Sequence, residues 1–179
     1  MDVFKVDFDD RQWQAFSESL KPERLQIAAR RAVRKTSAWV KTHIAREVKD
    51  RTKIPKKLIA SRVKVYDKNW RDGGGGGYAL KVWFGIDPVF ADRIAPARQT
   101  KTGVSVGKYR FPGAFIPTKS PRYMGKVYYR TTDNRLPIMR ARVEIEGEAR
   151  PAFEKIKQGI EARLMELMRQ ELNYELSKV

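Results

Sequence analysis

The stretch FPGAFIPTKSPRYMGKVYYRTTDNRLPI, residues 111–138, decides the fold. Two apolar runs, at 114–116 and 127–129, are separated by a connection that contains Pro and Ser. Aromatic and β-branched runs bounded by turn residues are typical of paired strands. The polar TTDN sequence at 131–134 predicts a tight turn after the second run. Helix-like segments lie on both sides, so we expect a sheet against which they bury their apolar faces.

Two long amphipathic helices are predicted, one on each side of this stretch. Residues 23–51 place apolar side chains at steps of three and four, and residues 149–177 repeat the pattern. Pro22 and Pro151 suit the first turns of these helices. We therefore expect an α+β fold, in which an antiparallel β-sheet is packed by a long N-terminal helix and a long C-terminal helix and carries extended assembly loops.

Shorter elements fill the remaining chain. Residues 62–66 and 78–86 alternate apolar and polar side chains and predict a hairpin across the glycine run at 73–77. A last strand is expected at 140–145, ended by Gly147, and residues 98–109 are expected to be an extended loop or hairpin without a core of its own. We expect a single domain over 1–179, with an N-terminal arm or strand at 1–10, helices at 11–51, a sheet region at 62–146 and a C-terminal helix at 149–177.

The charge is the strongest bulk property of the chain. Its 38 Lys and Arg residues against 21 Asp and Glu residues give a net charge of +17, which favours an anionic partner such as nucleic acid, an acidic protein surface or an anionic membrane. From Arg93 to Arg130 there is no acidic residue. The alternative is that the aromatic residues of this block form a core and its charges a solvated face. The candidates for facing an anionic partner or DNA are Lys53, Lys56, Lys57, Lys101, Lys108, Arg110, Lys119, Arg122 and Lys126.

The sequence gives no sign of an active site. It has no Cys and a single histidine, His43, which cannot form a ligand cluster. The acids Asp7, Asp9 and Asp10 fit helix caps better than a metal site, and the glycine run is not followed by the Lys-Ser/Thr pair of a phosphate-binding loop. We therefore expect no enzymatic activity, no metal and no cofactor.

Contacts between subunits are expected at two places. Phe4, Val6 and Phe8 would share one face of a short strand or of an arm that reaches a neighbouring subunit. Val104 and Val106 lie in the predicted loop, which is of the kind that orders on assembly. The N-terminus does not have the form of a secretory signal.

Part of the opening stretch resembles the core of the bacteriophage minor tail protein Z (tail completion) family. The helical layout at both ends and the LNYEL string at 172–176 extend the similarity. The residues that carry it are Pro112, Gly113, Ala114, Phe115, Ile116, Arg130, Arg135, Leu136, Pro137 and Ile138.

The resemblance implies a structural virion protein, made in the host cytoplasm, that completes the head-proximal end of the tail and takes part in head–tail joining. It further implies a ring of copies of the chain, expected to be hexameric, in contact with tail-tube, tail-terminator or neck proteins and with DNA in the channel. The residues themselves leave a free nucleic-acid-binding module open. A membrane-associated helix is a weaker alternative, because the Ala-rich apolar face of 23–51 would bind lipid poorly; we expect no membrane partner.

Overall fold

The computed structural model describes residues 21–72 and 75–178. Long helices and small antiparallel sheets make up the described chain, which confirms the α+β class. The chain forms two compact units. Unit 1 contains the described residues up to Glu47, Ala60–Gly85 and the described residues from Pro151, and unit 2 contains Val48–Ile59 and Ile86–Arg150.

Helix α2 (Pro22–Thr52) provides much of the core of unit 1. It begins at Pro22, as predicted, because the first helical residue needs no intrahelical N–H bond. One side is fully buried and contains small residues, so a neighbouring element can approach closely. The buried residues of this side include Ala28, Ala29, Ala32, Val33, Val40 and Ile44.

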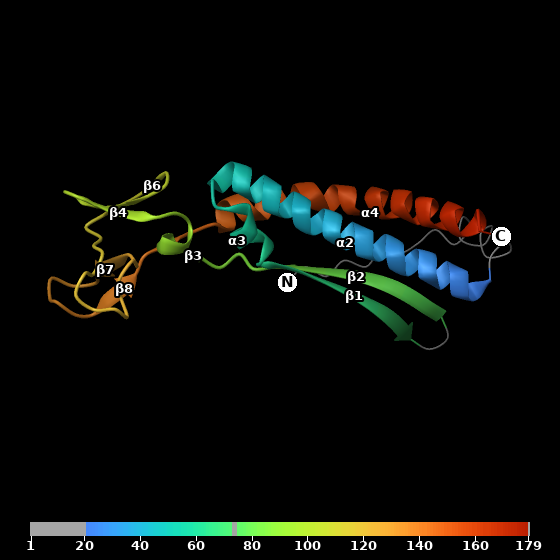
Figure 1. Cartoon of the computed structure of the whole chain (residues 1–179), viewed down its shortest axis with the longest axis horizontal. Coiled ribbons are helices and arrows are strands. Elements are labelled where there is room, and N and C mark those ends of the chain that lie inside the picture. Colours follow the sequence, from blue (N-terminus) through green and yellow to red (C-terminus); the bar gives the residue numbers. More distant parts are fainter. Residues whose placement is uncertain (1–20, 73–74, 179) are drawn as a thin grey trace. The chain divides into compact units, whose positions relative to one another are not determined.

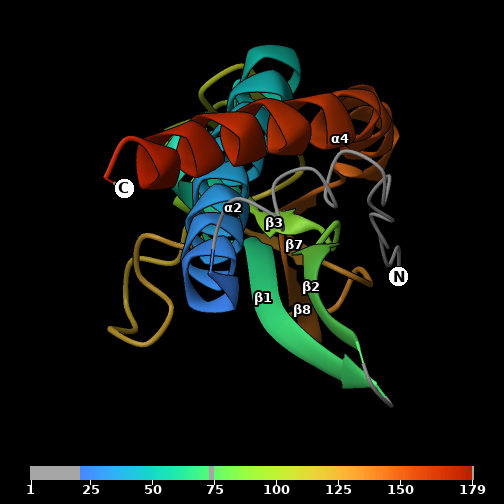
Figure 2. The ribbon, with the colours of Figure 1, turned by 90° about the vertical axis from the view of Figure 1, so that its right-hand side faces the viewer.

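A hairpin of β1 (Val63–Asp72) and β2 (Gly75–Phe84) belongs to the same unit. Its antiparallel register runs from Val63 opposite Phe84 to Asp72 opposite Gly75, which confirms the predicted pairing across the glycine run. Figure 1 shows the hairpin on one side of the pair formed by α2 and α4, and Figure 2 shows the same arrangement turned by 90°. Phe84 stacks on Phe153 with ring centroids 6.4 Å apart, so the hairpin also packs on α4.

Helix α4 (Glu146–Leu176) runs antiparallel to α2 (Figure 1). It begins three residues earlier than predicted, and Gly147 lies in its first turn instead of ending a strand. The reason is the buried Ile145, whose carbonyl accepts hydrogen bonds from the N–H groups of Glu148 and Ala149 at 3.2 and 2.8 Å. Pro151 consequently lies inside the helix and not in its first turn.

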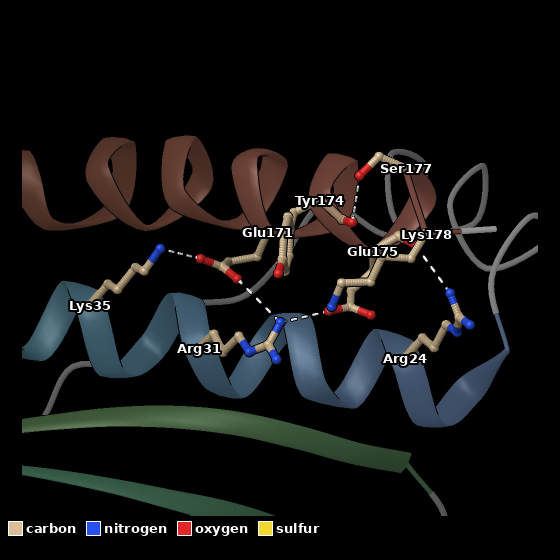
Figure 3. Close-up of polar contacts among 8 residues, drawn as sticks. All are labelled: Arg24, Arg31, Lys35, Glu171, Tyr174, Glu175, Ser177 and Lys178. Atoms are coloured by element: carbon tan, nitrogen blue, oxygen red, sulfur yellow. Dashed lines mark hydrogen bonds and ion pairs between the residues drawn. The ribbon is translucent and has the colours of Figure 1, made fainter.

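Ion pairs join α2 to α4 near the C-terminal end of α4 (Figure 3). The carboxylates of Glu171 and Glu175 belong to residues that are each 4% exposed. Arg31 lies between them, 3.9 Å from Glu171 and 2.6 Å from Glu175, while Lys35 also pairs with Glu171 and Lys178 with Glu175. Hydrogen bonding by Lys178, aided by Arg31, lowers the pKa of Glu175 despite the burial of its carboxyl group. We call these five residues the α2–α4 clasp; it holds two carboxylates that would be costly to bury without partners.

Unit 2 contains a three-stranded antiparallel sheet of β4 (Ala97–Thr100), β5 (Gly103–Val106) and β6 (Tyr109–Pro112). This sheet occupies the segment predicted to be an extended loop or hairpin without a core of its own. Val104 and Val106 are 2% and 0% exposed, so the expectation that this segment has no core of its own is wrong. The alternating valines bury one face of β5, a pattern that a run of only four residues signals weakly.

The stretch at 111–138 pairs as predicted, but over shorter lengths. The two apolar runs meet in a single bridge, in which Phe115 and Tyr128 exchange N–H···O bonds of 2.8 and 3.0 Å. Strands β7 (Tyr128–Arg130) and β8 (Ile138–Arg140) then form a hairpin closed by the predicted turn region.

The strand expected at 140–145 is divided between two sheets. The N–H of Ala141 donates to Val127 and its carbonyl accepts from Ala91, so the chain changes partners at this residue. Beyond it, β9 (Arg142–Val143) pairs with β3 (Val89–Phe90), which leads into the 3-10 turn η1 (Ala91–Arg93). The described chain therefore has four small sheets in place of the one expected. A short helix α3 (Lys56–Ala60) follows α2.

Candidate anion-binding surface

Most of the excess positive charge belongs to unit 2. Its 18 basic and 7 acidic residues give a net charge of +11, out of +17 for the whole chain. All nine residues expected to face an anionic partner fall within this unit, and all but the half-buried Lys126 are exposed. Such a concentration of one sign of charge creates a field that attracts anions.

The end of α2 meets the turn between β5 and β6. The hydroxyl of Tyr109 donates to the carbonyl of Thr52 at 2.5 Å, and the ammonium group of Lys108 donates to the carbonyl of Arg51 at 3.2 Å. The last carbonyls of a helix have no partner within the helix, so these two side chains cap α2. Sequence reasoning missed this contact, because nothing in the residues signals a pairing across 57 positions.

Five of the predicted basic residues belong to this region, which we call the α2-end corner: Lys53, Lys56, Lys57, Lys108 and Arg110. Lys53 follows the helix with a positive φ of 59°, and its N–H donates to the carbonyl of Lys49 at 2.7 Å. Arg110 donates to the carbonyl of Gly107 at 2.9 Å. The corner therefore combines two side chains held by backbone carbonyls with three exposed lysines on the α2–α3 connection and α3.

The hydroxyl of Tyr109 donates the hydrogen bond that caps α2 in this corner. Its partial burial raises its pKa, and the nearby carboxylate of Glu148 raises it further. The phenol consequently stays protonated at neutral pH and keeps its hydrogen bond to Thr52. Burial also raises the pKa of Tyr129.

A second basic group lies on the connection between β6 and β7. Lys119 and Arg122 are exposed, and the ammonium group of Lys126 donates to the carbonyl of Arg122 at 2.7 Å. The guanidinium of Arg122 lies 5.7 Å from the centroid of the Tyr123 ring. Lys101 is exposed in the turn between β4 and β5.

The aromatic residues of the basic block pack on one another. Phe111 and Tyr128 are buried, Phe111 meets Tyr129 edge-on at 6.2 Å, and Tyr123 meets Tyr128 edge-on at 5.6 Å. These rings supply packing for unit 2, which favours the interpretation of the aromatics as core over their use as stacking platforms for bases.

The residues that carry the family resemblance come together in unit 2. Phe115 bridges to Tyr128, the guanidinium of Arg130 lies 5.3 Å from the centroid of the Phe115 ring, and Ile138 is paired with Arg130 across the β7–β8 hairpin. Leu136 lies in the exposed turn of that hairpin, before a cis peptide bond to Pro137. The strings at 112–116 and 135–138 are therefore parts of one local assembly.

Gln99 fixes this assembly to the three-stranded sheet. Its amide nitrogen donates to the carbonyls of Gly103 and Ala114 at 2.9 and 3.3 Å, and its amide oxygen accepts from the N–H of Ile116 at 2.9 Å. Sequence analysis did not single out this residue, because a lone Gln in a polar segment carries no signal of such a role.

The predicted subunit contacts have different outcomes. Val104 and Val106 are buried inside unit 2 and are not available to a neighbouring subunit, so this expectation is corrected. Phe4, Val6 and Phe8 lie outside the described residues, as do Asp7, Asp9 and Asp10.

No group of three metal-ligating side chains is found among the described residues. His43 stacks on Trp39 with ring centroids 4.2 Å apart, and its Nδ1 lies 2.8 Å from the Trp39 carbonyl, so it is a packed helix residue. In the part of the chain that the structure describes, no helix has the length and apolar character needed to cross a membrane.

Compared with known proteins, the chain matches no protein-family model, no curated protein and no solved structure.

Proposed function

We propose that this chain is a structural protein of a phage virion that completes the head-proximal end of the tail as a ring-forming component. The observation that carries the proposal is the assembly of the family-like residues, in which Phe115, Arg130 and Ile138 lie together in the more basic unit.

The β7–β8 hairpin offers a surface for assembly. Leu136 and Met139 are 66% and 56% exposed, and Met124 on the preceding connection is also exposed. Exposed large apolar side chains of this kind are candidates for burial by a partner. Basic groups on the same unit favour an acidic neighbour, for which tail-tube, tail-terminator and neck proteins are candidates.

Ring formation tests this proposal directly. The purified chain, alone and mixed with candidate tail proteins, should form rings visible by negative-stain electron microscopy and a matching species in sedimentation velocity. The double variant L136D/M139D should lose them, because charge on the apolar surface opposes its burial.

The control is T131D/T132D, which adds the same charge to exposed polar positions of the same turn. Rings are expected to persist in this control. A chain that stays monomeric with every partner, or equal loss of rings in both variants, would argue against the proposal.

The α2-end corner supports a second candidate, a nucleic-acid-binding function. Lys53, Lys56 and Lys57 are exposed together beside Lys108, as a phosphate backbone would require. Binding through them would weaken with salt, with a log–log slope of about −0.9 for each phosphate contacted on duplex DNA.

This candidate is tested by titrating duplex and single-stranded DNA at several salt concentrations. The variant K56E/K57E should bind more weakly and with a shallower salt slope than R30E/R34E, which makes the same change of charge on exposed positions of unit 1. Equal effects of the two variants would remove the α2-end corner as a DNA site.

A further inference from the structure

Three arginines surround the ring of Phe90 in unit 2. The guanidinium carbons of Arg140, Arg142 and Arg93 lie 3.9, 5.0 and 5.8 Å from its centroid. They come from three elements: Arg140 ends β8, Arg142 is paired with Phe90 across the β3–β9 bridge, and Arg93 ends η1. We call Phe90, Asp92 and these arginines the Phe90 cluster.

Only one of the three arginines is neutralised within the cluster. Asp92 accepts two hydrogen bonds from Arg140, at 2.9 and 2.6 Å, and its side chain is 10% exposed. Hydrogen bonding to Asp92 is the main cause that raises the pKa of Arg140. Among the described residues, no carboxylate forms an ion pair with Arg93 or Arg142. This holds also for Glu144, which is exposed two positions after Arg142. The cluster therefore holds two positive charges in excess.

Placing like charges around one ring is unfavourable unless something offsets their repulsion. The face of Phe90 attracts each guanidinium by a cation–π interaction. The bidentate pair with Asp92 offsets one charge. Arg93 and Arg142 are exposed, and the planar fork of an arginine has donors that match the oxygens of a phosphate group.

We propose that the Phe90 cluster is an anion-binding site that takes a phosphate group between the forks of Arg93 and Arg142. Phe90 orients the two side chains, and Asp92 occupies the fork of Arg140, so that Arg93 and Arg142 supply the excess charge. A phosphate dianion matches the two excess charges, and its tetrahedral oxygens accept hydrogen bonds from two forks that approach from different elements. The site is distinct from the α2-end corner and independent of ring assembly.

The test is isothermal titration calorimetry in a low-salt buffer free of phosphate and sulfate. The probes are inorganic phosphate and a short oligodeoxythymidine with and without a 5′-phosphate. Single variants R93Q and R142Q should each lower phosphate affinity by about tenfold or more, the loss expected for a charged hydrogen-bonding group. The controls R98Q and R135Q remove the same charge from exposed positions of unit 2 and should change the affinity little.

A second variant separates binding from folding. D92N frees the Arg140 guanidinium, so phosphate should bind at least as tightly to it as to the unchanged chain, in samples that retain the original melting temperature. If the 5′-phosphorylated oligonucleotide binds more tightly, the site recognises terminal phosphates. If both oligonucleotides bind equally, the site recognises backbone phosphates. Absence of phosphate binding, or equal loss in R142Q and R98Q, overturns the site while leaving ring formation as a separate question.

Discussion

The carboxylate of Glu175 lies 2.6 Å from the guanidinium of Arg31 and joins the last turns of α4 to α2 (Figure 3). Arg24 adds a hydrogen bond of 3.3 Å to the backbone carbonyl of Glu175, and Glu47 pairs with Lys155 at 3.1 Å toward the other end of the two helices. These contacts require an antiparallel arrangement. The α2–α4 clasp thus fixes the register of two helices whose apolar faces alone would tolerate sliding.

The first prediction concerns the pH dependence of the α2–α4 clasp. The pKa of Glu175 is lowered in the folded chain, so its ionised form stabilises the fold above the ordinary carboxyl pKa of about 4.3. This stabilisation is lost as the pH falls through the lowered value. E175Q should reduce the melting temperature at pH 7 and flatten its decline below about pH 4.3.

The comparison for E175Q is E161Q, which removes a carboxylate from an exposed position of the same helix. Circular dichroism melting curves at closely spaced pH values supply the measurement. A melting-temperature difference between wild type and E175Q that stays constant from pH 7 to pH 3 would contradict the assignment.

The second prediction concerns the cap on the end of α2. Y109F removes the hydroxyl that donates to Thr52 and should cost about 1 kcal/mol of unfolding free energy, measured by urea titration. The pKa of Tyr109 is raised, so this contribution is present below the ordinary phenol pKa of about 10 and is lost as the pH rises through the raised value.

Y123F is the control for the cap, because the Tyr123 ring packs on Tyr128 and its hydroxyl makes no hydrogen bond within the described part of the chain. It should be close to neutral. Equal losses in Y109F and Y123F would show that the Tyr109 hydroxyl does not stabilise the end of α2.

The third prediction concerns Gly103 in the three-stranded sheet. A Cβ at this position would lie 2.1 Å from the carbonyl oxygen of Phe111, a backbone atom that cannot move aside without disturbing β6. G103A should therefore destabilise unit 2 by about 2 kcal/mol or more. G147A, in the first turn of α4, meets nothing within 4 Å and should be neutral or stabilising. The measurement is the melting temperature of both variants relative to the unchanged chain. An unchanged melting temperature for G103A would refute the packing argument.

Local patterns were sufficient to predict the long helices and the β1–β2 hairpin. The periodicity of 23–51, Pro22 at the helix start and the alternation on both sides of the glycine run are all short-range signals. Short apolar runs were weaker predictors of structure. Val104 and Val106 form a buried strand face that four residues could not reveal, and the early start of α4 depends on the burial of Ile145.

The candidate sites depend on contacts between distant parts of the chain. Residue types and charge runs identified the exposed lysines. They did not predict that Tyr109 contacts Thr52, or that Arg93, Arg140 and Arg142 lie around Phe90. The partner exchange at Ala141, which positions Arg140 and Arg142 on successive sheets, has no local signal. A single sequence predicts helices and strands better than it predicts the tertiary contacts between them.

The last prediction concerns Lys53, which directly follows α2 and lies in the left-handed region at φ 59°. This conformation costs a residue with a side chain about 1–2 kcal/mol, and glycine adopts it freely but loses more entropy on folding. K53G should therefore stabilise the chain by about 0.5 kcal/mol. K57G removes the same charge from the interior of α3 and should be destabilising, by up to about 1 kcal/mol. Urea titrations of the two variants give the comparison. If K53G loses as much stability as K57G, the left-handed conformation at the end of α2 is not a source of strain.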